Sequence, residues 1–226
     1  MSNVKIMDKS FKILGVCGGI CSGKSLACRI LRDFPETMAY IDADSLAHKV
    51  YTPGSQAIED IRSYFGASVI DASSGTVNRK ELGAIVFNDR GEMAALERIV
   101  WPYVKQNLEK ELDRLRTNIS DNSGNIVVVE AAVMLDADWS DLFDGIWVVR
   151  SPEEVVLNRL VKNRGLTLDE ANSRVNAQAS RRGIGNVDEE FRNGVVTAVI
   201  ENEGAEEDLT NKLKESWISA QCWKGS

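Results

Sequence analysis

The chain has 226 residues, of which 43% are hydrophobic and 27% are charged, as in ordinary soluble globular domains. No stretch approaches the run of about 20 apolar residues that a membrane span needs, and the first residues resemble neither a signal nor a transit peptide, so we expect a cytoplasmic protein. The formal net charge of −7 argues against a nucleic-acid-binding protein, which normally carries a basic surface.

Short apolar runs alternate with helical patterns along the whole chain. In chain order we expect a strand at 12–17, a helix at 24–34, a strand at 38–41, a helix at 45–51, a helix over 91–116 that is continuous or bent at Pro102, strands at 126–129 and 146–149, helices that begin with capping boxes at Ser151 and Thr167, and a strand at 195–200. Because the apolar runs are unalternated and separated by helices, they indicate a buried parallel sheet. The pattern therefore predicts an α/β fold.

A glycine-rich segment follows the first expected strand and opens the first expected helix. It fits the pattern G-x-x-x-x-G-K-[ST] with the residues Gly18, Gly19, Ile20, Cys21, Ser22, Gly23, Lys24 and Ser25. In such a P-loop the backbone N–H groups cradle phosphate oxygens at the positive end of the helix. Lys24 then reaches the transferring phosphate, and the Ser25 hydroxyl binds magnesium. We predict that this segment binds a nucleotide.

Acidic residues stand at the ends of two other expected strands. Asp42 and Asp44 follow the second strand, and Glu130 ends the third. In open α/β sheets ligands bind at the carboxyl ends of the strands. Carboxylates there serve either magnesium or the hydroxyl that receives the phosphoryl group. An alternative for Asp44 is that it caps the helix at 45–51.

A P-loop alone does not distinguish a kinase from other nucleotide-binding proteins. The guanine-recognition pattern Asn-Lys-x-Asp is missing, because Asn211-Lys212-Leu213-Lys214 lacks the aspartate, and this argues against a GTPase. A small-molecule or nucleoside monophosphate kinase, and a non-kinase P-loop switch, both fit the P-loop.

Further motifs run in order from about Lys12 to about Trp217. They are Asp42-Ala43-Asp44-Ser45-Leu46-Ala47-His48, Val77-Asn78-Arg79-Lys80-Glu81-Leu82-Gly83 with Val86-Phe87, Trp101-Pro102, Glu130-Ala131-Ala132-Val133-Met134-Leu135-Asp136, Gln178 and Val199-Ile200-Glu201-Asn202. Together these motifs resemble the dephospho-CoA kinase family. Trp101-Pro102 and the Ala-Ala-Val-Met-Leu run are most similar to the kinase domain of the bifunctional eukaryotic CoA synthase.

The resemblance implies ATP-dependent phosphorylation of the ribose 3′-hydroxyl of dephospho-CoA, the last step of coenzyme A synthesis. It implies a P-loop NTP hydrolase three-layer fold with a central parallel sheet, formed by a single domain over 1–226, with a helical substrate-binding region at 53–117 and a lid at 159–192. The implied cofactors are ATP and Mg²⁺, and the implied partner is dephospho-CoA. We expect neither nucleic acid nor membrane as a partner, and a monomer or a weak homo-oligomer.

The resemblance also assigns roles to single residues. Asp44 falls where the family has its proposed base, and Leu26 extends the P-loop where the family usually has threonine. The residues expected to contact the substrate are Asp42, Asp44, His48, Arg79 and Glu130. Arg159 and Arg164 are the expected catalytic lid arginines, and Asn202 is a candidate for the base pocket.

Composition supports a lid independently. Five arginines lie within one expected helical segment of an otherwise acidic protein, namely Arg159, Arg164, Arg174, Arg181 and Arg182. Arginines on a hinged flap can clamp the transferring phosphates and exclude water. The alternative is an ordinary basic, solvated helix face.

Overall fold

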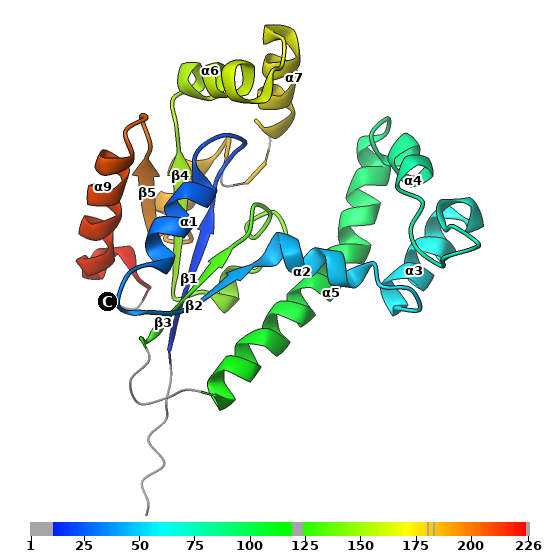
Figure 1. Cartoon of the computed structure of the whole chain (residues 1–226), viewed down its shortest axis with the longest axis horizontal. Helices are drawn as coiled ribbons and strands as arrows, with labels where there is room; N and C mark the ends of the chain where they lie inside the picture. Colours follow the sequence, from blue (N-terminus) through cyan, green and yellow to red (C-terminus); the bar gives the residue numbers. More distant parts are fainter. Residues whose placement is uncertain (1–10, 119–123, 180, 183, 225–226) are drawn as a thin grey trace, which may run out of the picture. The chain divides into compact units, whose positions relative to one another are not determined.

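A computed structural model describes residues 11–118, 124–179, 181–182 and 184–224. The chain divides into two compact units, one formed by the residues up to Ile41 and the described residues from 124 onward, the other by Asp42–Asn118. Figure 1 shows the second unit as the helices coloured from cyan to green. The expected helical region at 53–117 lies within this second unit.

The first unit is built on a five-stranded sheet with the order β2-β3-β1-β4-β5. The strands are β1 (Lys12–Cys17), β2 (Thr37–Asp42), β3 (Ile126–Glu130), β4 (Gly145–Arg150) and β5 (Ala198–Glu201). β1 pairs in parallel with both β3 and β4, and β4 pairs in parallel with β5. The expected α/β fold with a central parallel sheet is confirmed, although the last strand begins three residues later than expected.

Two helices cover one face of this sheet. α1 (Lys24–Arg32) packs against β1, β3 and β4, and α9 (Glu206–Ile218) packs against β5 and α1. The buried face of α1 consists of Ala27, Cys28 and Leu31, at the spacing of an amphipathic helix. These residues belong to the same hydrophobic core as Trp147 in β4. The Trp147 ring packs edge-on against the Trp217 ring, with the ring centroids 6.1 Å apart. This packing fixes the position of the turn between β1 and α1.

Two further helices of the first unit follow β4, and α8 (Val187–Arg192) comes after them. α7 (Leu168–Gln178) begins with the expected capping box, in which the Thr167 hydroxyl accepts from the Glu170 N–H and the Glu170 carboxylate accepts from the Thr167 N–H at 2.8 Å. The capping box expected at Ser151 is wrong. α6 (Glu153–Arg164) has Pro152 at its N-cap and no side-chain cap, because the Ser151 hydroxyl donates to the Asn202 carbonyl at 2.6 Å instead.

The second unit contains four α-helices among its described residues. They are α2 (Ala43–Val50), α3 (Gln56–Phe65), α4 (Arg79–Val86) and α5 (Arg90–Thr117). α5 runs on through Pro102 as one helical element, so a helix over the stripe at 91–116 is confirmed. Asp42 caps α2 by accepting from the N–H groups of Asp44 and Ser45, so the cap role considered for Asp44 is wrong.

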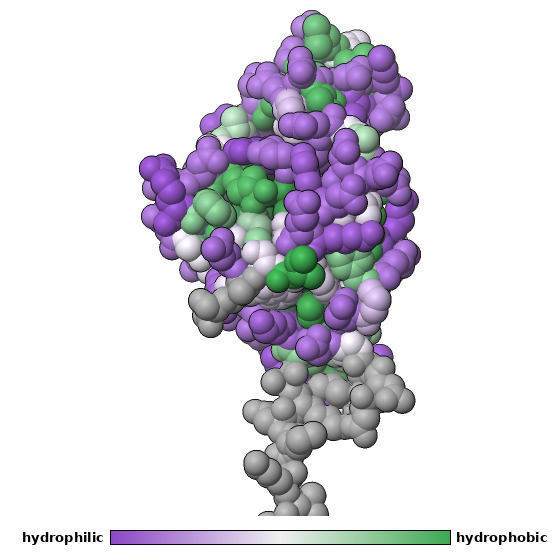
Figure 2. All heavy atoms as spheres, turned by 90° about the vertical axis from the view of Figure 1, so that its left-hand side faces the viewer, coloured by the Kyte–Doolittle hydropathy of each residue, from purple (hydrophilic) through white to green (hydrophobic). Residues whose placement is uncertain are grey.

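Short 3₁₀ turns lie at Ala67–Val69, Ser140–Leu142 and Ala220–Cys222. Polar side chains cover most of the face that Figure 2 shows, and apolar ones reach the surface there in separate groups. Within the described ranges no helix combines the length and the hydrophobicity needed to cross a membrane.

Candidate active site

The P-loop forms a tight turn between the end of β1 and the start of α1. Gly23 has φ 94°, in the left-handed region that favours glycine, and a Cβ built there would lie 2.0 Å from the Asn202 Nδ2 atom. A Cβ on Gly18 would lie 2.4 Å from the Val149 carbonyl oxygen. Two of the loop's glycines are therefore required by close contacts with β4 and with Asn202, which follows β5, as well as by the turn.

The start of α1 presents free backbone donors. Among the described residues, no protein acceptor is hydrogen-bonded to the N–H groups of Gly23, Lys24 or Ser25. The first N–H groups of a helix have no partner within the helix, and the helix dipole adds positive potential there. This group of free amides is suited to bind phosphate oxygens.

Glu130, at the end of β3, connects the two reactive side chains of the P-loop. Its Oε1 atom accepts from the Lys24 ammonium and, at 2.7 Å, from the Ser25 hydroxyl. Its Oε2 atom accepts from the Tyr40 hydroxyl at 2.6 Å. The Lys24 and Glu130 side chains are only 12% and 7% exposed, so the ion pair is largely shielded from water.

The same contacts set the protonation state of Glu130. Burial alone would raise the pKa of this carboxyl, but the hydrogen bonds from Lys24, Tyr40 and Ser25 outweigh burial and hold its pKa below the usual range. Glu130 is therefore a carboxylate at neutral pH. Because Ser25 donates its hydroxyl proton to Glu130, the lone pairs of its Oγ atom stay available for a cation.

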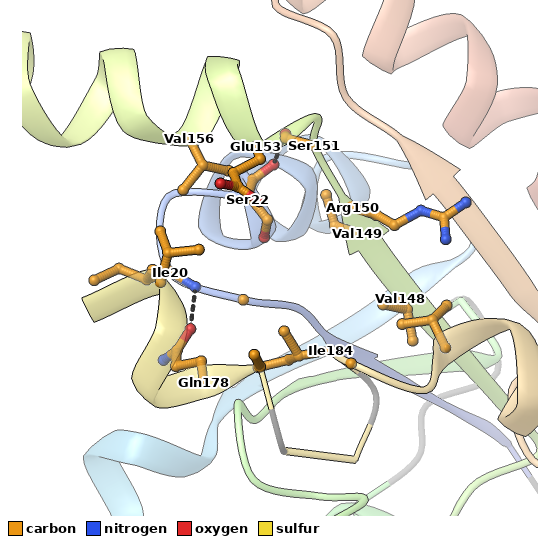
Figure 3. A pocket seen from close by; sticks show the side chains of 15 residues that line it. Ile20, Ser22, Val148, Val149, Arg150, Ser151, Glu153, Val156, Gln178 and Ile184 are labelled. Carbon is orange, nitrogen blue, oxygen red and sulfur yellow. Dashed lines mark hydrogen bonds between the residues drawn. The ribbon is translucent and has the colours of Figure 1, made fainter. Parts of the chain in front are cut away.

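Side chains from distant segments hold the other side of the P-loop. Arg159, on α6, donates from Nη1 to the Cys21 carbonyl at 2.9 Å and from Nη2 to the Asn202 side-chain oxygen at 3.3 Å. Asn202, after β5, donates from Nδ2 to the Ser22 carbonyl at 2.8 Å. The Ile20 N–H donates to the Gln178 Oε1 atom at 2.8 Å, which Figure 3 shows as a dashed line.

A mostly apolar cavity of about 250 Å³ lies beside this side of the P-loop. It is lined by the loop residues Ile20 and Ser22, by the end of β4 and by residues of α6 and α7 (Figure 3). The cavity is bounded by P-loop, strand and lid-region side chains within the first unit.

Comparison with known proteins decides the family. The family model described as "Dephospho-CoA kinase" matches residues 12–208. A dephospho-CoA kinase of Thermobifida fusca is 33% identical over 208 residues, covering 92% of this chain and 96% of its own, and that of Geobacter sulfurreducens is 34% identical over 206 residues, covering 91% and 96%. The chain belongs to the dephospho-CoA kinase family. The closer resemblance to the kinase domain of eukaryotic CoA synthase stays a prediction.

Solved structures share the fold of this chain. A crystal structure of a Thermus thermophilus protein superposes with a TM-score of 0.68 at 28% identity, covering 93% of this chain and all of that one. The dephospho-CoA kinase from Campylobacter jejuni superposes with a TM-score of 0.59 at 22% identity, covering 90% and 94%, and shares the fold. Membership of the dephospho-CoA kinase family makes the chain an ATP-using kinase with a small-molecule acceptor.

The expected substrate residues lie mainly in the second unit. Asp44 is exposed in the first turn of α2, and His48 is exposed in the last turn of the same helix. Arg79 is the exposed first residue of α4. The Asp42 carboxylate caps α2 by accepting from the Asp44 N–H. Glu130 belongs to the first unit, beside the P-loop.

The arginines of the expected lid differ in their surroundings. Arg164 is exposed at the end of α6, whereas Arg159 is engaged with the P-loop backbone. Arg182 is bound by protein groups, since its Nε donates to Glu190 at 2.7 Å and its Nη1 donates to the Leu135 carbonyl at 3.0 Å. These contacts favour a structural role for Arg182. Residues 180 and 183 of the expected lid lie outside the described residues.

Sequence reasoning missed three polar contacts of the site. The sequence predicts a capping role for Ser151, which bonds instead to the Asn202 carbonyl. No local pattern predicts that Gln178 accepts from the Ile20 N–H or that the Tyr40 hydroxyl donates to Glu130. A signal existed for Tyr40, because it is a polar-tipped side chain two positions before the acidic end of a strand. Asn202 does reach the site, but its side chain supports the P-loop backbone.

Proposed function

We propose that the P-loop site transfers the γ-phosphoryl group of ATP to the ribose 3′-hydroxyl of dephospho-CoA, giving coenzyme A. The observation that carries this proposal is the group of free amides at Gly23, Lys24 and Ser25, placed beside the Lys24 ammonium in a chain of this family. Free amides and an ammonium together match the charge of a nucleotide's terminal phosphates.

Lys24 has two partners in the proposed reaction. It pairs with Glu130 in the structure, and it turns toward the β- and γ-phosphates when ATP binds. Because the ammonium is already positioned at the end of the sheet, little reorganisation is required before the transferred charge develops. Glu130 keeps its bonds from Ser25 and Tyr40 during this step, so its carboxylate stays oriented.

The residues beside the P-loop fit a magnesium ion. The Ser25 hydroxyl and the Glu130 carboxylate are hard oxygen donors of the kind that Mg²⁺ prefers, and Mg²⁺ usually keeps several waters and uses substrate phosphates as further ligands. The described residues hold no cluster of three or more His, Cys, Asp or Glu side chains able to bind a metal by themselves. When bound, Mg²⁺ would neutralise charge on the phosphates.

The acceptor side of the proposed reaction involves the second unit. Asp44 accepts or orients the proton of the ribose hydroxyl. Asp42, His48 and Arg79 contribute to the dephospho-CoA site, which is formed by α2 and the helical region at 53–117. Arg159 and Arg164 contribute the positive charge of the lid at 159–192. In support, the side chains of Asp44, His48 and Arg79 are all exposed.

An acceptor screen tests this function. Purified protein with ATP and Mg²⁺ is assayed for ADP, first alone and then with dephospho-CoA, other small alcohols or nucleoside monophosphates as acceptors. We expect ADP and coenzyme A to form together only with dephospho-CoA. ADP production without acceptor stimulation would favour a nucleotide switch, and stimulation by another acceptor alone would contradict the proposed substrate.

A further inference from the structure

Gln178 is the last residue of α7, and its side chain reaches the P-loop. Its Oε1 atom accepts from the Ile20 N–H at 2.8 Å, across 158 residues of sequence (Figure 3). The amide group lies close to the loop backbone, since a Cβ built on Gly19 would be 3.5 Å from the same oxygen. Any side chain at Gly19 would therefore contact the Gln178 amide.

The bonded amide is not one of the free donors of the P-loop. The Ile20 N–H is bonded to Gln178, and the Ser22 N–H donates to the Gly19 carbonyl at 3.2 Å. The donors left without a protein acceptor, among the residues described, include those of Gly23, Lys24 and Ser25. Gln178 thus bonds to the first half of the loop and leaves the amides at the helix start available to phosphate.

The peptide that follows Ile20 has an unusual backbone. Cys21 has φ 55°, in the left-handed region, where a residue with a side chain is rarely found. Its carbonyl is held by Arg159 of α6, and the N–H of the residue before it is held by Gln178 of α7. Such a conformation persists where neighbouring groups fix it on both sides.

We propose that Gln178 is a positioning residue, which fixes the first half of the P-loop through the Ile20 amide and makes the geometry of the phosphate cradle depend on the placement of α7. The proposal rests on the function proposed above. It assigns no contact between Gln178 and the substrates. A glutamine suits this position because it offers an acceptor without a negative charge beside an anion site.

Two substitutions at this position separate the hydrogen bond from the shape of the side chain. Gln178→Met keeps the length and removes the acceptor, whereas Gln178→Glu keeps an acceptor and adds a negative charge. Asn176→Ala, at an exposed position of the same helix, is the matched control. Should Gln178→Met fold poorly, Gln178→Asn, one methylene shorter, removes the same bond with a smaller change of polarity.

The first measurement is hydrogen exchange of the Ile20 amide in the protein without nucleotide. Loss of one hydrogen bond should speed this exchange about tenfold in Gln178→Met, while Gln178→Glu and Asn176→Ala keep the protection. The second measurement is calorimetric binding of MgADP, with turnover measured beside it. We expect Gln178→Met to bind about tenfold more weakly and to turn over more slowly, with Asn176→Ala unchanged.

Two results would overturn the proposal. Unchanged exchange and unchanged MgADP binding in Gln178→Met would show that the bond does not fix the loop. Tighter MgADP binding in the same variant would show that Gln178 hinders the nucleotide. Because exchange is measured without any acceptor, a failure of dephospho-CoA as substrate leaves this test intact.

Discussion

At the scale of single residues, Lys24 has two roles, because it forms a shielded ion pair with Glu130 and also belongs to the P-loop. In the proposed reaction the ammonium neutralises charge on the phosphates, and in the structure it compensates a carboxylate whose side chain is 7% exposed. Removing one member of a buried pair leaves the other charge uncompensated, and this costs more than the pair itself contributes. A substitution of Lys24 therefore changes stability as well as chemistry.

Lys24→Ala should lower turnover by about 10³, because an electrostatic contact to the transferring phosphate is lost. It should also lower the free energy of unfolding by about 3 kcal/mol. The double variant Lys24→Ala/Glu130→Gln has no uncompensated carboxylate, so it should regain much of the lost free energy of unfolding. Its turnover should stay as low as that of Lys24→Ala. Urea unfolding and steady-state kinetics check both parts. Near-normal turnover in a folded Lys24→Ala protein would contradict the role of the P-loop lysine.

Asp42 and Asp44 are two positions apart and differ in their surroundings. Asp42 is the cap of α2, and asparagine caps a helix nearly as well as aspartate. Asp42→Asn should therefore stay close to wild type in stability. Asp44→Asn should lower turnover by about 10² to 10⁴ with nucleotide binding retained, since the group proposed to act on the acceptor hydroxyl loses its basicity. If instead Asp42→Asn is the inactive variant and Asp44→Asn turns over normally, Asp44 is not the base.

At the scale of elements, the segment after α7 is fixed to its neighbours by Arg182. The Glu190 carboxylate, on α8, accepts a hydrogen bond from the Arg182 guanidinium. This hydrogen bond lowers the pKa of Glu190, although burial of the carboxyl acts to raise it. A lowered pKa in the folded state stabilises the fold above the ordinary carboxyl pKa of about 4.3, and this contribution is lost as the pH falls.

Glu190→Gln should thus be less stable than wild type at pH 7, by about 1 kcal/mol, because Arg182 is 39% exposed and water weakens the pair. The difference should shrink as the pH falls below about 4, where the wild-type carboxylate takes up a proton. Thermal unfolding at several pH values measures this difference in stability between the wild type and Glu190→Gln. Glu189→Gln, at the exposed neighbouring position, is the control. A difference that is independent of pH would exclude an electrostatic origin.

Elements defined by local signals were predictable from the sequence, and elements defined by distant contacts were not. The apolar run at 126–129 and the capping box at Thr167 appear in the structure because each depends on residues nearby in sequence. The cap expected at Ser151 fails because its hydroxyl bonds to Asn202, 51 residues away. For the same reason the P-loop motif was predictable, whereas the bond from Ile20 to Gln178 was not.

At the scale of the whole molecule, the chain separates the two halves of its proposed chemistry into different units. The P-loop and Glu130 belong to the first unit, and Asp44, His48 and Arg79 belong to the second. Each unit has its own buried residues, as Leu14 and Trp147 illustrate in the first and Ile61 and Leu108 in the second. Each substrate, when it binds alone, should therefore protect the backbone amides of mainly one unit from hydrogen exchange.

Hydrogen exchange with single substrates tests this division. ATP alone should slow the exchange of amides in the P-loop and in α6, whereas dephospho-CoA alone should slow exchange in the segment 42–118. Mass spectrometry of peptic fragments locates the protection, and coenzyme A without the nucleotide serves as a second acceptor-site probe. Protection by dephospho-CoA confined to the first unit would place the acceptor site elsewhere.

The contacts that hold the P-loop also bear on how the molecule folds. The loop lies near the start of the chain, but its carbonyl and amide groups are bonded to Gln178, Arg159 and Asn202, at separations of 158, 138 and 180 residues. Contacts between distant residues form late, since the entropy of closing long loops has to be overcome first. We therefore expect the glycine-rich segment to leave the ribosome early without a fixed shape. Nucleotide binding should appear only after Asn202, which follows β5, has bonded to the P-loop.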